Sequence, residues 1–283
     1  MRRFEGASVM ITGASSGIGA ALARAFAAEG ASVALVARRP DRLDQVRRDI
    51  EAAGGRALVC ACDVSDAEGL RAAADQTAEA FGGLDVVVAN AGFGVSGCLE
   101  ALEMEDYRRQ FEVNFFGVIA TVQAVLPHLI RSKGRLGVVG SLAGCFGSPT
   151  TSAYNASKAA VMSLTESIYH ELDEHGVSVT CINPGFVASE IRSVNNQGKY
   201  TGNPDPVPRW LVLPAERAAA DMVRALHRRK PVVFITAHAR WLARLNRLSP
   251  CLVRWVVRRM TRGKLAKFQA ARRNTRPPSS DGA

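Results

Sequence analysis

A tyrosine and a lysine stand four residues apart in the segment YNASK, at Tyr154 and Lys158. In a helix this spacing puts both side chains on one face. An ammonium group beside a phenol favours the phenolate, so we expect Lys158 to lower the pKa of Tyr154 from its usual value of about 10 toward neutrality. A tyrosine tuned in this way can exchange a proton with an alcohol or a ketone. The same spacing also occurs in ordinary exposed pairs.

Two polar residues upstream could complete a site around this pair. Ser141 lies thirteen residues before Tyr154, and its hydroxyl could hydrogen-bond the substrate oxygen that Tyr154 protonates. Asn114 has apolar neighbours within a predicted helix, which is an unusual place for an amide. We expect Asn114 either to be buried with local hydrogen-bond partners or to order a water that relays protons to Lys158.

A glycine-rich turn near the N-terminus reads TGASSGIG and follows the first apolar run. Glycines let the backbone approach a pyrophosphate, while the start of the next helix offers free N–H groups and a positive dipole end. Glycines also serve plain turns, but a position between a predicted strand and a predicted helix favours dinucleotide binding. The predicted contacts of this turn are Gly13, Ser15, Ser16, Gly17, Ile18 and Gly19.

Two arginines, Arg38 and Arg39, follow the second apolar run, residues 32–36. A site specific for NAD(H) would place an acid here to bind the ribose 2′-hydroxyl, and that acid is missing. A guanidinium can pair bidentately with a 2′-phosphate, so the sequence predicts NADP(H) as the cofactor and Arg38 as the phosphate-binding residue. Arg39 is a second candidate for this role. The alternative for both is a solvated position before the next helix.

Further candidates follow the third and fourth predicted strands. Asp63 and Val64 come after the third strand, and Asn90, Ala91 and Gly92 come after the fourth. Taken singly, Asp63 could be a helix N-cap and Asn90 a turn residue. Because the carboxyl ends of parallel strands face one crevice, their joint placement predicts adenine and ribose contacts.

Short apolar runs alternate with alanine-rich helical stretches, which is typical of βαβ units and of a parallel sheet buried on both faces. The predicted strands are 8–11, 32–36, 56–60, 84–88, 135–139, 177–182 and 231–235, and the predicted helices are roughly 17–28, 41–53, 67–81, 106–131, 153–175 and 214–229. This order predicts an α/β fold with a doubly wound, seven-stranded parallel sheet. One catalytic domain would cover residues 1–236.

One long irregular segment, residues 188–214, interrupts this alternation. It contains four prolines, which discourage a continuous helix or strand. A loop this long inside a compact domain is usually functional, often as an active-site lid. We therefore predict that residues 188–214 form the substrate loop.

Composition excludes several classes of protein. Of 283 residues, 47% are hydrophobic and 22% are charged, which is an ordinary globular composition. The six cysteines form no CxxC pair and the five histidines form no HxxxH or HExxH group, so we expect reduced cysteines and no metal site. The first residues lack the apolar core of a signal peptide, and no run of about 18 uninterrupted apolar residues is present. These features predict a cytoplasmic protein.

Positive charge is concentrated at the C-terminal end. Residues 1–221 hold 20 basic and 25 acidic groups, whereas residues 222–280 hold 16 basic groups and no acidic one. Within 237–275 we predict amphipathic helices that carry arginines and Trp241 and Trp255, followed by a disordered tail at 276–283. Such helices suit an anionic membrane surface through residues 238–272, but their apolar sides could equally pack on the body or form a subunit interface. Nucleic acid is a poorer match, because aliphatic residues separate the charges.

Taken together, these motifs resemble the short-chain dehydrogenase/reductase superfamily over about residues 6–236. The matching pieces are TGASSGIG, Asp63, the segment NAG at 90–92, Asn114, Ser141, YNASK and the Pro184-Gly185 pair. The resemblance implies a Rossmann-type fold, a tetrad of Asn114, Ser141, Tyr154 and Lys158, and hydride transfer at the nicotinamide C4. It also implies cofactor contacts from Tyr154, Lys158, Pro184, Gly185, Val187 and Ser189, and a homodimer or homotetramer. Ser189 and Gly140 depart from the family pattern, which often has Thr and Ser there, but the tetrad is intact.

The sequence therefore predicts an NADP(H)-dependent oxidoreductase that interconverts a ketone and a secondary alcohol. The basic extension is similar to that of branches acting on 3-ketosphinganine, steroids, retinoids or long-chain acyl compounds, which favours a lipophilic small-molecule substrate. A noncatalytic NADP-binding regulatory or scaffold protein is the alternative. A serine hydrolase based on Ser141 is disfavoured, since the segment GSLAG is not a GxSxG elbow.

Overall fold

A parallel sheet forms the centre of the molecule. The computed structural model describes residues 2–202, 205 and 207–273, with side chains described as far as Arg262. Within these residues seven strands lie in the order β3-β2-β1-β4-β5-β6-β7, and all neighbours are parallel. The strands are β1 (Ser8–Thr12), β2 (Ser32–Ala37), β3 (Arg56–Ala61), β4 (Val86–Ala89), β5 (Arg135–Val139), β6 (Ser178–Asn183) and β7 (Val232–Phe234). The order reverses between β1 and β4, the switch point at which such sheets bind ligands.

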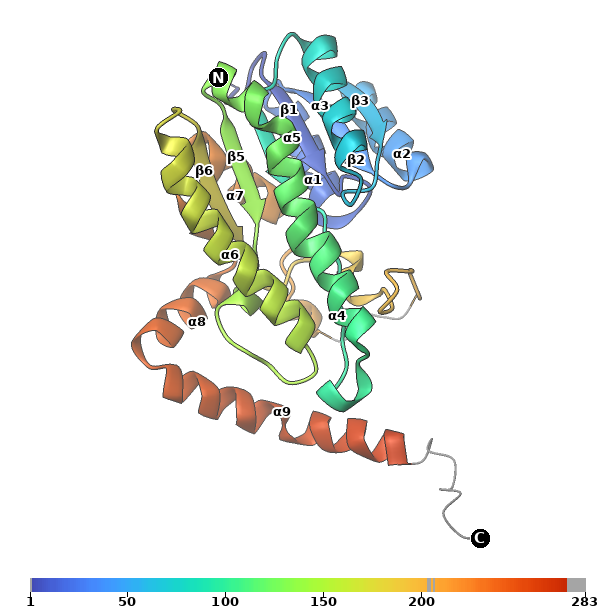
Figure 1. Cartoon of the computed structure of the whole chain (residues 1–283), viewed down its shortest axis with the longest axis vertical. Coiled ribbons are helices and arrows are strands. Elements are labelled where there is room, and N and C mark those ends of the chain that lie inside the picture. The colour runs from blue at the N-terminus through green and yellow to red at the C-terminus, as the bar shows by residue number, and fades with distance from the viewer. Residues whose placement is uncertain (1, 203–204, 206, 274–283) are drawn as a thin grey trace.

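Helices cover both faces of the sheet, as Figure 1 shows. One face carries α1 (Gly17–Ala28), α2 (Pro40–Ala52) and α7 (Ala215–His227), and the other carries α3 (Ala67–Phe81), α5 (Gly117–Ser132) and α6 (Ser152–Asp173). Short 3-10 turns lie at η1 (Leu99–Ala101), η3 (Leu142–Gly144), η4 (Glu190–Arg192) and η5 (Arg209–Leu211). The predicted doubly wound, Rossmann-type α/β fold is confirmed.

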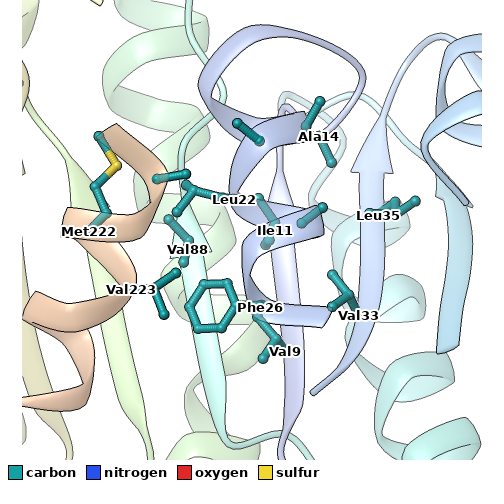
Figure 2. Close-up of a cluster of buried hydrophobic side chains, with 14 of the residues drawn as sticks. Val9, Ile11, Ala14, Leu22, Phe26, Val33, Leu35, Val88, Met222 and Val223 are labelled. Atoms are coloured by element: carbon teal, nitrogen blue, oxygen red, sulfur yellow. The ribbon is translucent and has the colours of Figure 1, made fainter. Parts of the chain in front are cut away.

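The strand β1 lies at the centre of the core, and all five of its residues are buried. Figure 2 shows Val9 and Ile11 of β1 packed against Phe26 of α1, while Met10 joins the cluster on the opposite face. Phe26 is fully buried, so its truncation to alanine should cost about 3–5 kcal/mol. This packing fixes the place where β1 passes into the glycine-rich turn.

Two elements differ from the sequence prediction. The strand β4 begins at Val86, and the preceding Asp85 accepts hydrogen bonds with its carboxylate from the backbone N–H and hydroxyl of Ser8, at 2.9 and 3.1 Å. The predicted helix 106–131 is divided into α4 (Met104–Phe111), a π-helical turn η2 (Glu112–Phe116) and α5. Such π turns are rare and occur frequently at functional sites.

The apolar stretch Met104–Ser132 also has the length and composition of a membrane span. In this fold Val118, Val125 and Leu129 are buried in the core on the face shared with α3 and α6. A core helix of a globular protein passes the same test of length and composition. The packing therefore accounts for the apolar character of this stretch.

Two helices, α8 (Ala237–Leu248) and α9 (Pro250–Arg273), follow β7 and run along the lower edge of the molecule in Figure 1. Their inner sides are attached to the body, since Ala239 and Val253 are buried and the Asn246 side chain donates a 2.9 Å hydrogen bond to the Cys145 carbonyl. Trp241 and Trp255 face outward and are 73% and 60% exposed. The inner sides of the two helices therefore pack on the body, which is one of the predicted alternatives, and membrane contact or a subunit interface stays a prediction for the exposed sides. The predicted tail 276–283 lies outside the described residues.

Candidate active site

One cavity of about 530 Å³ opens at the carboxyl ends of the strands. It is lined by every residue for which the sequence predicts cofactor contact, namely Gly13, Ser15, Ser16, Gly17, Ile18, Gly19, Arg38, Asp63, Val64, Asn90, Ala91, Gly92, Tyr154, Lys158, Pro184, Gly185, Val187 and Ser189. Ser141 also lines it, whereas Asn114 lies behind the wall. The volume lies within the usual range of cofactor sites.

The glycine-rich turn leaves no room for side chains at its glycine positions. Gly13 and Gly17 have φ values of +68° and +53°, which favour glycine. A Cβ on Gly19 would lie 2.2 Å from the Gly13 carbonyl oxygen, and one on Gly13 would lie 2.8 Å from the Ala91 Cα. Glycine is therefore required where the turn after β1, the start of α1 and the segment after β4 come close together.

The start of α1 directly after this turn is open to an anion. Its N-cap residue, Ser16, adopts extended backbone angles but makes no side-chain capping hydrogen bond. The first N–H groups of α1 thus keep their hydrogen-bonding capacity and the positive end of the helix dipole. Turn and helix start together fit a pyrophosphate group, as in other dinucleotide sites.

Asn90 lines the cavity as predicted, and its side chain also has a structural role. Its side-chain amide donates to the Thr12 carbonyl at 2.9 Å, and its backbone N–H donates to the Thr12 hydroxyl at 3.0 Å. These bonds tie the end of β4 to the end of β1. The Asn90 side chain therefore holds the glycine-rich turn in position, while the backbone beyond it lines the cavity.

Tyr154, Ser141 and Lys158 form what we call the catalytic end of the cavity. Tyr154 lies in the first turn of α6, and Ser141 follows β5. The Ser141 hydroxyl accepts a 3.1 Å hydrogen bond from the Ala143 N–H and is also hydrogen-bonded to the Tyr154 hydroxyl. Lys158 is only 3% exposed, and its Nζ donates a 2.8 Å hydrogen bond to the Val139 carbonyl.

The electrostatics at Tyr154 differ from the sequence prediction. Burial raises the pKa of Tyr154, while the hydrogen bond with Ser141 and the positive charge of Arg192 lower it. The charge that lowers the pKa of Tyr154 belongs to Arg192, while the Lys158 Nζ donates its hydrogen bond to Val139. Burial lowers the pKa of Lys158 to about 8. The expectation that Lys158 brings the tyrosine pKa down is therefore wrong for this state of the protein.

Asn114 is fully buried in the π-helical turn. Its amide oxygen accepts from the Phe93 N–H and its amide nitrogen donates to the Phe93 carbonyl, both at 3.0 Å. The nitrogen also lies 3.3 Å from the Ser157 hydroxyl. Of the two alternatives for Asn114, its side chain follows the first: it is a buried amide with local partners that anchor the loop after β4.

The opposite part of the cavity, lined by Arg38, Arg39, Ser15, Ser16 and Asp63, is called the adenosine end below. The Arg39 guanidinium donates hydrogen bonds to the Ser15 and Ser16 hydroxyls, both at 3.0 Å. Arg38 is more exposed and pairs with Asp63 at 3.5 Å. Asp63 is not a helix N-cap, since Asp66 caps α3 through the Glu68 and Gly69 N–H groups.

The predicted substrate loop, 188–214, is called the lid below, and its residues Ser189 to Arg192, Val194 and Gly198 to Tyr200 line the cavity. Glu190 of the lid pairs with Arg39 at the adenosine end. At the other end, Asn196 accepts from the Ser96 N–H at 3.0 Å and donates to the Ser96 carbonyl at 3.1 Å. The lid is therefore attached at both ends of the cavity.

The segment that leads into the lid depends on the start of α8. A Cβ on Gly185 would lie 2.2 Å from the Thr236 hydroxyl and 2.3 Å from the His238 Nε2. The Phe186 N–H donates to His238 Nε2 at 3.0 Å, and burial lowers the pKa of His238. The first turn of α8 thus supports the floor of the cavity.

Three residues of the lid and its surroundings were not singled out in the sequence. Arg192 lines the cavity, pairs with Asp205 at 2.5 Å and donates to the Val187 carbonyl at 2.9 Å. Glu190 and Asn196 make the lid contacts described above. The sequence located the segment through its prolines, but no local pattern marks which of its polar side chains point inward.

Known proteins resemble the chain in sequence and in fold. The family model "short chain dehydrogenase" matches residues 7–199, more than half of the chain. An 11-beta-hydroxysteroid dehydrogenase A of Sesamum indicum is 35% identical over 263 residues, covering 90% of this chain and 75% of the relative. A dehydrogenase/reductase SDR family protein 7-like of Anopheles gambiae is 30% identical and covers 91% and 84%.

Two solved structures give the same picture. A short chain dehydrogenase of Burkholderia cenocepacia in complex with NADP is 32% identical, with a TM-score of 0.74, and covers 84% of this chain and 99% of its own. A short chain dehydrogenase/reductase of Burkholderia phymatum in complex with NAD is 27% identical, with a TM-score of 0.79, and covers 89% and 96%.

Proposed function

The chain belongs to the short-chain dehydrogenase/reductase family, and from this membership we propose that it is an NADP(H)-dependent oxidoreductase interconverting a ketone and a secondary alcohol. The observation that carries the proposal is the shared cavity: Tyr154 and Ser141 lie at one end, and the glycine-rich cradle and two arginines lie at the other. A bound nicotinamide would supply or accept the hydride at its C4.

The protein's own groups manage the proton and the substrate oxygen. Tyr154 donates its phenolic proton to the carbonyl oxygen in reduction and removes it from the alcohol in oxidation. Its raised pKa keeps the phenol protonated near neutral pH, which suits the acid required for reduction. Ser141 already bonds the Tyr154 hydroxyl and holds the substrate oxygen beside it.

Lys158 and Asn114 support this exchange. A lysine with a pKa of about 8 can be found in either protonation state near neutral pH, so Lys158 can pass a proton to Tyr154 and hold the nicotinamide ribose. Asn114 positions Phe93 and Ser157 around the lysine. It is a positioning residue, with the π-helical turn as its support.

The cofactor preference is assigned to NADP(H). Arg38 and Arg39 both line the cavity where β2 ends, and guanidinium groups recognise a 2′-phosphate. A solved relative in complex with NADP is 32% identical to this chain. Among the residues around this end, the acids Asp63 and Glu190 are already paired with arginines.

The substrate is assigned to lipophilic ketones and alcohols. Phe93, Ile191 and Val194 line the cavity. Large apolar side chains on the flanking segments are exposed: Leu99, Met104, Tyr200 and Trp210. Ser96 and Asn196 join these two segments. A relative named an 11-beta-hydroxysteroid dehydrogenase supports this class of substrate.

We propose a cytoplasmic protein that forms a homodimer or homotetramer. Peripheral contact with an anionic membrane would bring a lipophilic substrate close to its cavity. The outer sides of α8 and α9 expose Trp241 and Trp255, and the two helices carry exposed arginines at 240, 244, 247, 254, 258, 259 and 262, three of which, at 254, 258 and 262, line a shallow pocket beside Gly147 and Pro149. Deletion of residues 250–283 keeps α8 under Gly185 and should weaken sedimentation with anionic liposomes. Unchanged sedimentation would remove membrane contact from the proposal.

The proposed function is tested by following oxidation of NADPH and NADH with ketones of rising chain length. We expect turnover with NADPH to exceed turnover with NADH and to rise with chain length. Equal rates with both cofactors would refute the preference for NADP(H). Absence of turnover with every ketone and either cofactor would instead support the noncatalytic alternative.

A further inference from the structure

Glu190 of the lid reaches across the cavity to the adenosine end. One carboxylate oxygen lies 3.2 Å from the Arg39 Nη2, and the other lies 3.8 Å from the Arg42 Nη1. The two partners are far from Glu190 in sequence, so these contacts join the lid to the region after β2. Glu190 is the more covered member of each pair, with 28% of its side chain exposed.

The same guanidinium nitrogen of Arg39 that contacts Glu190 also donates to the Ser15 and Ser16 hydroxyls. Three oxygens therefore compete for one nitrogen that carries two hydrogens. Two arginines and two serine hydroxyls around one point form the kind of site that recognises phosphate. The Glu190 carboxylate lies where a phosphate would contact Arg39.

The contact holds a larger part of the lid in place. The neighbouring Ser189 lies against the glycine-rich turn, where a Cβ on Gly17 would be 3.0 Å from the Ser189 Cβ. Farther along the lid, a Cβ on Gly198 would be 3.9 Å from the Arg38 guanidinium. The lid thus contacts the glycine-rich turn and lies beside Arg38 while Glu190 is paired with Arg39.

We propose that Glu190 is a latch: its carboxylate takes the place of the 2′-phosphate of NADP(H), holds the lid over the adenosine end and is displaced when the phosphate binds. A phosphate monoester carries a charge of roughly −1.5 to −2 and three acceptor oxygens, so it outcompetes one carboxylate for Arg39 and Arg42. NAD(H) has a hydroxyl there and leaves the latch closed. Glu190 is therefore a specificity-determining residue, an inference that rests on the proposed NADP(H) preference.

The latch is tested with nucleotide fragments that reach only the adenosine end. Calorimetry measures the Kd of 2′,5′-ADP and of 5′-ADP for the wild-type protein and for Glu190→Gln. Removing the competing charge should strengthen 2′,5′-ADP binding about fivefold, the weight of one partly exposed ion pair, and change 5′-ADP binding less than twofold. Glu171→Gln, at the exposed end of α6, is the control for loss of one negative charge and should change neither Kd.

Tryptic cleavage within the lid gives a second readout without turnover. In the wild-type protein, 2′,5′-ADP should accelerate cleavage after Arg192, Lys199 or Arg209, and 5′-ADP should not. In Glu190→Gln the lid should be cut rapidly with no ligand and gain nothing from 2′,5′-ADP. Mass spectrometry of the fragments identifies the sites.

The outcomes separate this inference from the proposed function. If the wild-type protein binds both fragments equally, the preference for NADP(H) fails and the latch fails with it. If it prefers 2′,5′-ADP but Glu190→Gln changes neither that Kd nor lid cleavage, only the latch is overturned. An equal gain in affinity for both fragments also overturns it, because Glu190 would then oppose the pyrophosphate rather than replace the 2′-phosphate.

Discussion

At the catalytic end of the cavity the polar groups are buried and supported by regular elements, whereas at the adenosine end they are exposed guanidinium groups on loops. Lys158 is 3% exposed and bonds the last carbonyl of β5, while the side chains of Arg38 and Arg39 are 62% and 44% exposed. The chemistry at the catalytic end depends on how the core positions its buried polar side chains. The adenosine end depends on charge, which water and salt screen.

This difference predicts how each end responds to change. Substitutions at the catalytic end should act mainly on the chemical step and leave cofactor affinity nearly constant. Substitutions at the adenosine end should act on affinity and selectivity, and their effects should shrink as salt rises. The predictions below follow from the largest expected effect to the smallest.

Tyr154→Phe removes one hydroxyl and should lower kcat about a thousandfold, since it removes the acid that protonates the substrate. The Kd of NADPH should change less than twofold. Tyr169→Phe makes the same atomic change on the same helix, outside the cavity, and should keep kcat. Steady-state kinetics and calorimetry measure the two quantities, and a loss of less than tenfold in kcat would remove Tyr154 from its role.

The burial of Lys158 at the catalytic end should make the free energy of unfolding depend on pH. The pKa of Lys158 is lowered to about 8, so between about pH 8 and 10 the unfolded chain binds more protons at this site than the folded protein. The free energy of unfolding of the wild-type protein should therefore rise with pH in this window relative to Lys158→Met, by up to about 3 kcal/mol. Urea unfolding of both proteins at several pH values measures the difference, and a constant difference would contradict the buried, charged lysine.

Arg39→Ala should weaken NADPH binding about tenfold and NADH binding less than twofold, because Arg39 contacts the phosphate-binding turn directly. Arg38→Ala should cost about threefold, since Arg38 is more exposed. Both losses should diminish at high salt. Arg71→Ala, on the exposed side of α3, is the control. A larger effect of Arg38→Ala than of Arg39→Ala would reverse this order.

The sequence predicted the sheet and the order of its elements. Parallel strands that are buried on both faces must be continuous apolar runs, and such runs are easy to recognise in a sequence. The sequence also placed Ser141 and Tyr154 in one cavity, since Ser141 directly follows β5 and Tyr154 lies in the first turn of the next helix, α6, at the same carboxyl edge of the sheet. These are local patterns, and short-range physics is enough to interpret them.

The orientation of long side chains could not be predicted in this way. The spacing of Tyr154 and Lys158 placed them on one helical face, but it could not show that the lysine Nζ donates its hydrogen bond to the Val139 carbonyl on β5. Glu190 and Arg39 are separated by 151 residues, and no sequence pattern near either residue predicts their contact. The ranking of Arg38 above Arg39 as the phosphate-binding residue rested on position alone and stays a prediction.

The central claim is that this cavity transfers a hydride from NADPH to a carbonyl carbon while Tyr154 supplies the proton. Its most direct test is mass spectrometry of the alcohol formed from a ketone and NADPH carrying deuterium at the transferred C4 position. The account predicts one deuterium on the carbinol carbon with the wild-type protein and almost no alcohol with Tyr154→Phe. An alcohol without deuterium, or equal yields from both proteins, would contradict it.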